Sequence, residues 1–173
     1  MKMEIEKINS LIKEFEISDL VEYIQSLSRE EKQKATLYLL NQLKITQDHN
    51  DRNMLAIALS DLECQEAVET LMQLIFKPGL EKHSGSLVYA LGDLECTRYY
   101  KELLPLLFKG NFQVRMNMYG VMEAIFPKLT QEEQQWCIDY IEKQMEEYEA
   151  MLQQVYAVYE DVMGGKLETE EED

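Results

Sequence analysis

The chain has 173 residues, of which 46% are apolar and 29% are charged, and its net charge at pH 7 is −16. An apolar fraction of this size argues against a disordered chain and is enough for the core of one compact domain. Acidic residues exceed basic ones by 33 to 17. This excess argues against nucleic acid as a partner, because phosphate backbones would be repelled, and it favours a basic protein partner.

The cysteines and the apolar runs predict a cytoplasmic protein. The three cysteines show no CxxC spacing, which is typical of a reducing environment. The first 15 residues carry a charge every few positions and contain no apolar signal-peptide core. No apolar run approaches the roughly 20 residues that a membrane helix requires, so we expect no membrane association.

Residues 1–50 are expected to form two or three capping helices. Ser28-Arg-Glu-Glu31 has the capping-box pattern and predicts a helix that ends near Leu43. Ser18 is expected to cap a shorter helix that runs through Leu27.

An internal repeat follows these helices. When the chain is shifted by 32 residues, residues 55–77 align with residues 87–109, and eleven of the 23 positions are identical. Composition alone would give roughly two identities. The turn Asp61-Leu-Glu-Cys64 belongs to this match and returns as Asp93-Leu-Glu-Cys96. The apolar residues on either side have helical spacing, so each unit is predicted to be two helices joined by this turn.

The repeat resembles the HEAT-like repeat of the phycobilisome-lyase type. The stretch that carries the resemblance is Ala58-Leu-Ser-Asp-Leu-Glu-Cys-Gln-Glu-Ala-Val-Glu-Thr-Leu-Met-Gln-Leu-Ile75, supported by Ala90-Leu-Gly92 and Val114-Arg115. The resemblance covers residues 51–140 and implies armadillo-like stacking of three units, at residues 51–82, 83–112 and 113–140. The predicted fold is therefore all-α: a short right-handed α–α solenoid of HEAT-like helical hairpins with N-terminal capping helices and a long C-terminal helix.

The repeat turns depart from the family pattern at two residues. Glu63-Cys64 and Glu95-Cys96 stand where the family has Gly-Asp, whose aspartate caps the second helix. Cysteine is a poor cap, so we expect Glu63, Glu95 or Thr97 to meet the unpaired amides of that helix.

A long acidic helix is predicted over residues 131–163. Thr130-Gln-Glu-Glu133 is a second capping box, and apolar residues recur in steps of three and four from Ile138 to Val162, which is the spacing of a coiled-coil seam. This seam must pack against the flank of the repeats, the N-terminal helices or a second copy. Packing within the chain is favoured, and a homodimer through residues 138–162 is the alternative. Gly164-Gly165 is expected to end the helix and leave residues 164–173 as a disordered acidic tail.

The repeated turns are expected to be structural rather than reactive. Cys64 and Cys96 hold equivalent positions in stacked units, where neighbouring helices lie about 8–10 Å apart, too far for a disulfide. The carboxylates of these turns could form a ladder, but they lack the dense oxygen cluster of a calcium loop.

The sequence contains no catalytic motif. His49 and His83 are the only histidines, and neither belongs to an HExxH or a His-Glu pattern. No phosphate-binding glycine loop, nucleophile elbow or dinucleotide fingerprint is present. We therefore expect no cofactor, no metal and no enzymatic activity. The resemblance itself leaves one enzymatic alternative, a HEAT-like lyase or chaperone that acts on a cofactor-bearing protein.

The remaining prediction is a protein-binding module. Second helices line the concave ligand face of stacked helical repeats. The outward residues there form the candidate partner-binding strip: Glu66, Glu69, Gln73, Arg98, Tyr99, Lys101, Glu102, Glu132, Asp139 and Glu142. Its expected role is that of an adaptor or an acidic, immunity-type inhibitor that masks a basic partner. A structural scaffold that dimerises through the C-terminal helix is the alternative.

Overall fold

The computed structural model describes the backbone of residues 2–170 and the side chains of residues 5–162. Within this part of the chain 82% of the residues are helical and no strand occurs, which confirms the all-α prediction. The chain divides into two compact units, Met1–Leu129 and Thr130–Asp173, whereas the composition suggested a single domain. The second unit is one helix, and a single helix has no core of its own to fold around.

The first unit begins with three helices, α1 (Lys2–Glu14), α2 (Ile17–Ser26) and α3 (Arg29–Ile45). The predicted capping box at the start of α3 is confirmed, because Ser28 Oγ accepts from the Glu31 amide at 3.4 Å and Glu31 Oε2 accepts from the Ser28 amide at 3.1 Å. The predicted cap at Ser18 is wrong. Phe15 takes a left-handed conformation (φ 58°) that ends α1, and α2 starts two residues later, which places Ser18 inside its first turn.

The first repeat unit consists of α4 (His49–Asp61) and α5 (Ala67–Ile75). Asp48 starts α4 by accepting hydrogen bonds from the amides of Asn50 and Asp51 at 2.8 and 3.0 Å. Glu63 ends it in a left-handed conformation (φ 54°), with the Cys64 amide donating to the Leu59 carbonyl at 2.9 Å. This is the helix-ending motif in which glycine is common, so Glu63 occupies the place that the family gives to glycine.

The second repeat unit starts with α6 (Gly85–Leu91), which follows the short turn η1 (Glu81–His83). Its second helix was expected to be continuous but is broken into η2 (Thr97–Tyr99), α7 (Tyr100–Leu103) and α8 (Leu106–Lys109). Pro105 lies at the break. Proline interrupts the helix because it has no amide hydrogen to donate and its ring collides with the preceding turn.

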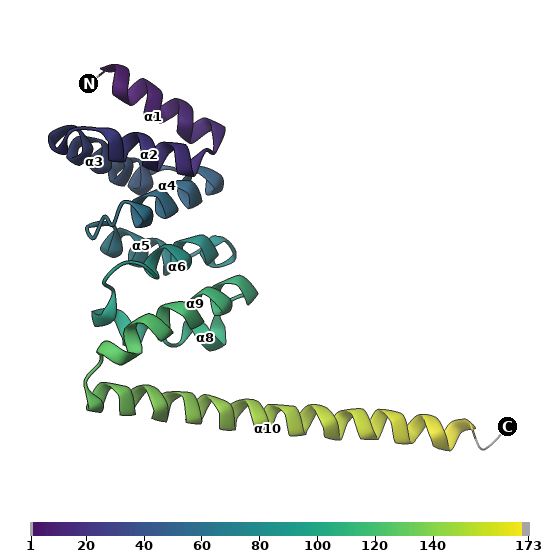
Figure 1. The fold of residues 1–173 in the computed structure, drawn as a ribbon. Helices are drawn as coiled ribbons and strands as arrows, with labels where there is room; N and C mark the ends of the chain where they lie inside the picture. Colours follow the sequence, from purple (N-terminus) through teal and green to yellow (C-terminus); the bar gives the residue numbers. More distant parts are fainter. Residues whose placement is uncertain (1, 171–173) are drawn as a thin grey trace. The chain divides into compact units, whose positions relative to one another are not determined.

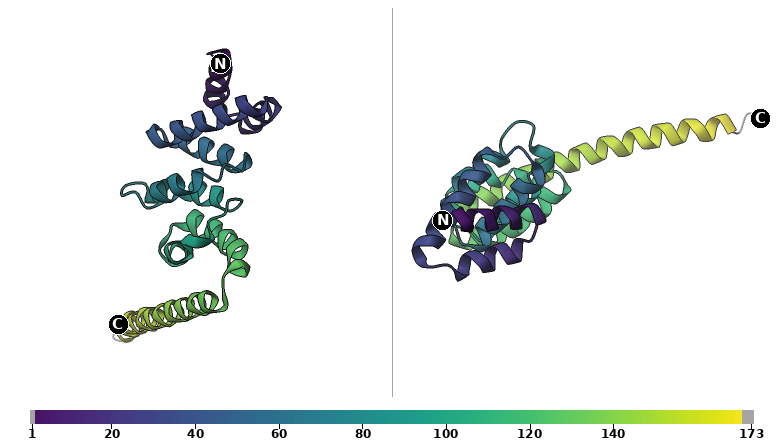
Figure 2. Two further views of the ribbon diagram at one scale, coloured as in Figure 1. Left: turned by 90° about the vertical axis from the view of Figure 1, so that its left-hand side faces the viewer. Right: turned by 90° about the horizontal axis from the view of Figure 1, so that it is seen from above.

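The third unit contributes α9 (Phe112–Ile125), capped by Asn111, and η3 (Phe126–Lys128). Helices α4, α6 and α9 pack against one another in that order, so the first helices of the three units form successive layers (Figures 1 and 2). Hydrogen bonds join the second and third layers: Asn117 Nδ2 donates to the Gly85 carbonyl at 2.9 Å, and Asn111 Nδ2 donates to the Glu81 carbonyl at 3.1 Å.

Gly85 lies where α6 contacts the Gln113 side chain of α9. A Cβ atom at this position would lie 2.4 Å from the side chain of Gln113. Glycine therefore lets α9 settle close to α6, and a larger residue would force Gln113 to move.

The second unit is α10 (Gln131–Glu170), 40 residues long. Its predicted capping box is confirmed, since Thr130 Oγ1 accepts from the Glu133 amide at 3.3 Å and Glu133 Oε2 accepts from the Thr130 amide at 2.8 Å. The predicted end at Gly164-Gly165 is wrong, because the helix continues to Glu170. Each glycine costs a helix only about 1 kcal/mol relative to alanine, which a long helix can absorb. Of the predicted tail, residues 171–173 lie outside the described residues.

Gln65 joins the two repeat turns and provides a test of the layer register. Its side chain donates to the Glu95 carbonyl at 2.7 Å and accepts from the Glu95 amide at 3.0 Å. We expect Gln65→Ala to lower the free energy of unfolding by about 1 kcal/mol, because both hydrogen bonds are lost at an exposed site. Urea denaturation would measure this change. Gln73→Ala, at an exposed glutamine of the neighbouring helix, is the matched control, and an equal loss in both variants would contradict the role of the Gln65 bridge.

Candidate interaction surface

The predicted strip is exposed on α5. Glu66 stands at the start of this helix, and Glu69 and Gln73 follow it at helical spacing, all with exposed side chains. The opposite face of α5 is buried, including Val68 and Leu71. This part of the strip is therefore the solvent face of an amphipathic helix, as predicted.

In the second repeat unit the strip has two basic residues and one acidic residue. Arg98, Lys101 and Glu102 are exposed on η2 and α7, and Tyr99 is half-buried. Arg98 Nη2 donates to the Tyr99 hydroxyl at 2.7 Å, and the guanidinium carbon lies 4.6 Å from the centre of the tyrosine ring. Tyr99 is thus held by its neighbour, and the two basic residues offset the acidic character expected of the strip.

The last three predicted residues belong to the second unit. Glu132, Asp139 and Glu142 are exposed on α10, and Asp139 accepts a hydrogen bond from Gln135 Nε2 at 2.8 Å. From residue 131 to residue 162 this helix carries nine acidic residues and one basic residue, Lys143. The strongly acidic surface of the chain therefore lies on α10 rather than on the repeat units.

Cys64 and Cys96 are buried thiols of the repeat turns. Burial, chiefly, raises the pKa of each thiol to about 11, and nearby Glu66 and Glu95 respectively act in the same direction. The Cys64 thiol donates to Glu66 Oε2 at 3.6 Å, and the Cys96 thiol donates to the Leu91 carbonyl at 3.7 Å. A nucleophilic or metal-binding cysteine needs a lowered pKa, whereas these two thiols are buried and have a raised pKa.

The repeated carboxylates behave differently in the two turns. Partial burial raises the pKa of Asp61, and the nearby negative charge of Asp93 adds to this shift. Glu95 has its pKa lowered to about 2 by hydrogen bonds from Lys128 Nζ at 2.8 Å and from Thr97. Glu95 Oε1 accepts from the Thr97 amide at 3.1 Å, so it meets an unpaired amide at the start of η2, as expected.

Metal-binding groups do not gather in the structure. Among the described residues, no three His, Cys, Asp or Glu side chains come together as a candidate ligand set. His49 and His83 stack on each other with ring centres 3.8 Å apart, and His49 Nδ1 lies 2.8 Å from Nη1 of the buried Arg52. This contact ties the start of α4 to η1, and it leaves the stacked rings a structural role.

A hollow of about 470 Å³ lies between α1 and α3. Its floor includes Ile8, Ala35 and Tyr38, and its rim carries the ion pair between Glu30 and Lys34. Neither a cysteine nor a histidine lines it. The hydroxyl of Tyr38 donates to Asn9 Oδ1 at 2.7 Å, which links α3 to α1. The hollow is lined by five apolar residues and by Ser28, Glu30, Glu31, Lys34, Tyr38 and Asn41.

The structure also presents an apolar surface that the sequence analysis did not identify. Ala56 on α4 and Val88 on α6 occupy equivalent repeat positions, and both are 0% exposed between their own layer and the next. The equivalent residue of the third unit is Tyr119, which is 65% exposed. Tyr119 thus lies on the stacking face of α9, the first helix of the third repeat unit.

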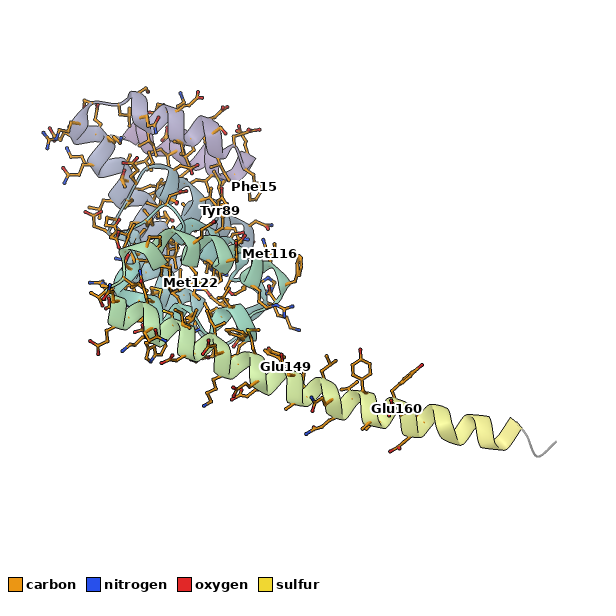
Figure 3. All side chains as sticks on the ribbon, turned by 60° about the horizontal axis from the view of Figure 1, so that its bottom comes forward. Phe15, Tyr89, Met116, Met122, Glu149 and Glu160 are labelled. Carbon is orange, nitrogen blue, oxygen red and sulfur yellow. The ribbon has the colours of Figure 1, made fainter. Side chains whose placement is uncertain are left out.

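Two more large apolar side chains share that face. Phe112 and Met116 precede Tyr119 by seven and three residues, within reach of one side of α9, and they are 72% and 58% exposed. Val114 and Met118 lie on the buried side of the same helix. Figure 3 labels Met116 on α9 together with Tyr89, another exposed aromatic residue, on α6. We call Phe112, Met116 and Tyr119 the end face.

A signal for the end face is present in the sequence. Tyr119 follows Val88 by 31 residues and Ala56 by 63, so the repeat register assigns it to an inter-layer position. No known protein family, curated protein or solved structure matches the chain. The interpretation of its surfaces therefore depends on their geometry alone. Within the described residues, no helix is both long enough and apolar enough to cross a membrane.

The turn cysteines lead to a test by alkylation. At pH 8 a thiol with a pKa of about 11 is roughly 0.1% thiolate, against about a quarter for an unfolded cysteine with a pKa near 8.5. We expect iodoacetamide to modify Cys64 and Cys96 at least about 100-fold more slowly in the folded protein than in urea. Peptide mass spectrometry after timed quenching would measure each site.

The raised pKa of the two thiols also determines how their contribution to stability changes with pH. Because folding raises the pKa of these thiols, their contribution to stability is present below about pH 8.5 and is lost as the pH rises toward 11. Equal alkylation rates in the folded and unfolded protein would show that the turn cysteines are not buried thiols.

Proposed function

We propose that the protein is a non-enzymatic protein-binding module built as a short HEAT-like α–α solenoid. The ordered packing of α4, α6 and α9 and the hydrogen bonds of Asn111 and Asn117 to the preceding layer support this architecture. In such a fold each layer covers the stacking face of the one before it, and terminal layers need a polar outer face to remain soluble alone. The right-handed HEAT-like assignment is part of the proposal.

The end face is the observation that carries the proposal. It presents Phe112, Met116 and Tyr119 at the side of α9 where the preceding layers bury Ala56 and Val88. Aromatic and methionine side chains clustered on a rigid surface are typical of interaction sites. A polar terminal layer is the solubility requirement, so large apolar residues there indicate a surface that is covered in the functional complex.

The partner is proposed to be basic. A net charge of −16 attracts positively charged proteins and repels nucleic acid. The acidic residues of α10, including Glu132, Asp139 and Glu142 of the predicted strip, would accelerate the encounter. A partner helix with an apolar side and basic flanks would satisfy both features. Masking such a basic surface is the action of an adaptor or an immunity-type inhibitor, and that role rests on charge and architecture alone.

The end face is tested by the double substitution Met116→Glu and Tyr119→Glu. Because both side chains are exposed, we expect little change in stability, within about 0.5 kcal/mol for each, and a loss of bound partner of about tenfold or more. The measurement is capture of proteins from a lysate of the cells that make this chain, with quantitative mass spectrometry and confirmation with the purified partner.

The matched control for the end face is Leu37→Glu with Ile45→Glu. These residues are 56% and 65% exposed on α3, and the pair adds the same two negative charges. Equal loss of the partner in both double variants would contradict an end-face site.

The acidic strip of α10 is tested by reversing Glu132, Asp139 and Glu142 to lysine. We expect the affinity for the purified partner to fall and to depend less steeply on salt between 50 and 400 mM, because fewer charges act across the interface. Glu16, Asp19 and Glu22, exposed residues in or next to α2, give a control reversal with the same change of net charge. An effect of equal size in the control would assign the dependence to net charge rather than to the strip.

A further inference from the structure

The seam of α10 is exposed over its second half. Met145, Tyr148, Leu152, Val155, Tyr159 and Val162 are the seam residues from 145 onward, and they are 42% to 58% exposed. The second unit is a single helix, so it cannot cover this seam by itself. A helix that leaves a coiled-coil seam exposed to water needs another surface to become stable.

The exposed face is wider than the seam. Met151 and Val158 border it on one side and Tyr156 on the other, and they are 53%, 63% and 60% exposed. Residues 150–159 carry no charge at all, whereas seven acidic residues and one lysine lie between residues 131 and 149. Figure 3 labels Glu149 and Glu160, which stand at the two ends of this uncharged segment. An uncharged, exposed segment of ten residues inside an acidic helix marks a contact surface.

We propose that residues 145–162 of α10 bind the same segment of a second copy as an antiparallel helix pair. In heptad terms, Met145, Leu152 and Tyr159 hold one core position, and Tyr148, Val155 and Val162 hold the other. An antiparallel pair places the first kind opposite the second. With Leu152 opposite Val155 of the other copy, Met145 meets Val162 and Tyr159 meets Tyr148, so the segment is complementary to itself under a two-fold axis.

The flanking positions agree with this arrangement. In that register Met151 lies opposite Val158 of the other copy, which adds an apolar pair on one side. On the other side Glu149 lies opposite Tyr156, whose hydroxyl can donate a hydrogen bond to the carboxylate. Within residues 145–162 no like charges meet at the core or flanking positions, although Glu146 and Glu147 lie level with Asp161 and Glu160 of the other copy on the outer faces of the pair. The overlap spans about 27 Å of helix.

Charge decides between the two orientations. A parallel, in-register pair would bring the acidic stretch 131–149 of one copy alongside that of the other, with seven acidic residues on each helix. Like charges at this spacing repel. The antiparallel pair overlaps through the uncharged segment and sends the two acidic stretches away in opposite directions. The inference goes beyond the proposed function and does not rest on it, because the end face is on another helix.

The pairing is tested by measuring the mass of the full chain by light scattering. At about 50 µM we expect twice the chain mass of 20.4 kDa. Leu152→Glu with Val155→Glu should return the monomer mass, because charges would then enter the core of the pair. Gln153→Glu with Gln154→Glu adds the same charge to the same turn outside the seam and should remain a dimer. Circular dichroism checks that helix content is unchanged in both variants.

Orientation is tested by disulfide formation between single-cysteine substitutions in a Cys137→Ser background. An equimolar mixture of Met145→Cys and Val162→Cys proteins should form a mixed disulfide dimer upon mild oxidation, and Met145→Cys alone should not. A monomer at 50 µM, or a dimer that survives Leu152→Glu with Val155→Glu, would overturn the proposal. Ready cross-linking of Met145→Cys alone would overturn the antiparallel arrangement. If the end-face variants kept their partner, the light-scattering masses and the cross-linking results would not change. The two proposals can therefore fail separately.

Discussion

The close packing of α4, α6 and α9 through small side chains is the constraint on which the first unit depends. Ala56 and Val88 are fully buried between layers, and Gly85 leaves room for Gln113 where α6 and α9 approach each other. Close approach of this kind fixes the offset between layers, because side chains of one helix must enter the grooves of the next. The hydrogen bonds of Asn117 to Gly85 and of Gln65 to Glu95 then follow from that offset.

The same constraint defines the surface available for binding. A stack of layers buries its small residues and must stop somewhere, and here the last first helix carries Tyr119 where the earlier ones carry Ala56 and Val88. Burial keeps the thiols of Cys64 and Cys96 protonated, and Glu95 is engaged by Lys128 and Thr97. Recognition through an exposed apolar face is what this arrangement can provide.

The second unit separates two properties along one helix. The acidic residues gather in the first half of α10, and the uncharged apolar face follows between residues 150 and 159. The first feature attracts a basic surface over a distance, whereas the second requires direct contact and the exclusion of water. A chain that combines them can associate with itself through one segment and present its charge through the other.

Sequence reasoning predicted the helical class, both capping boxes and the start of the long helix, and it identified the 32-residue period. These are local or periodic properties, set by backbone hydrogen bonds and by the spacing of apolar side chains. It also located the residues of the second helices that face solvent, such as Glu69 and Gln73. It did not reveal the break at Pro105, where a strong repeat match concealed a residue that cannot continue a helix.

Which apolar residues are covered depends on the tertiary structure. Val88 and Tyr119 look alike in the repeat pattern, and the difference between them is whether another layer of the first unit follows. The seam of α10 is likewise an apolar pattern in the sequence, while its exposure from Met145 to Val162 is a property of the fold. The physical reason is that apolar spacing records a side chain's need for burial, whereas burial itself depends on the surface that meets it.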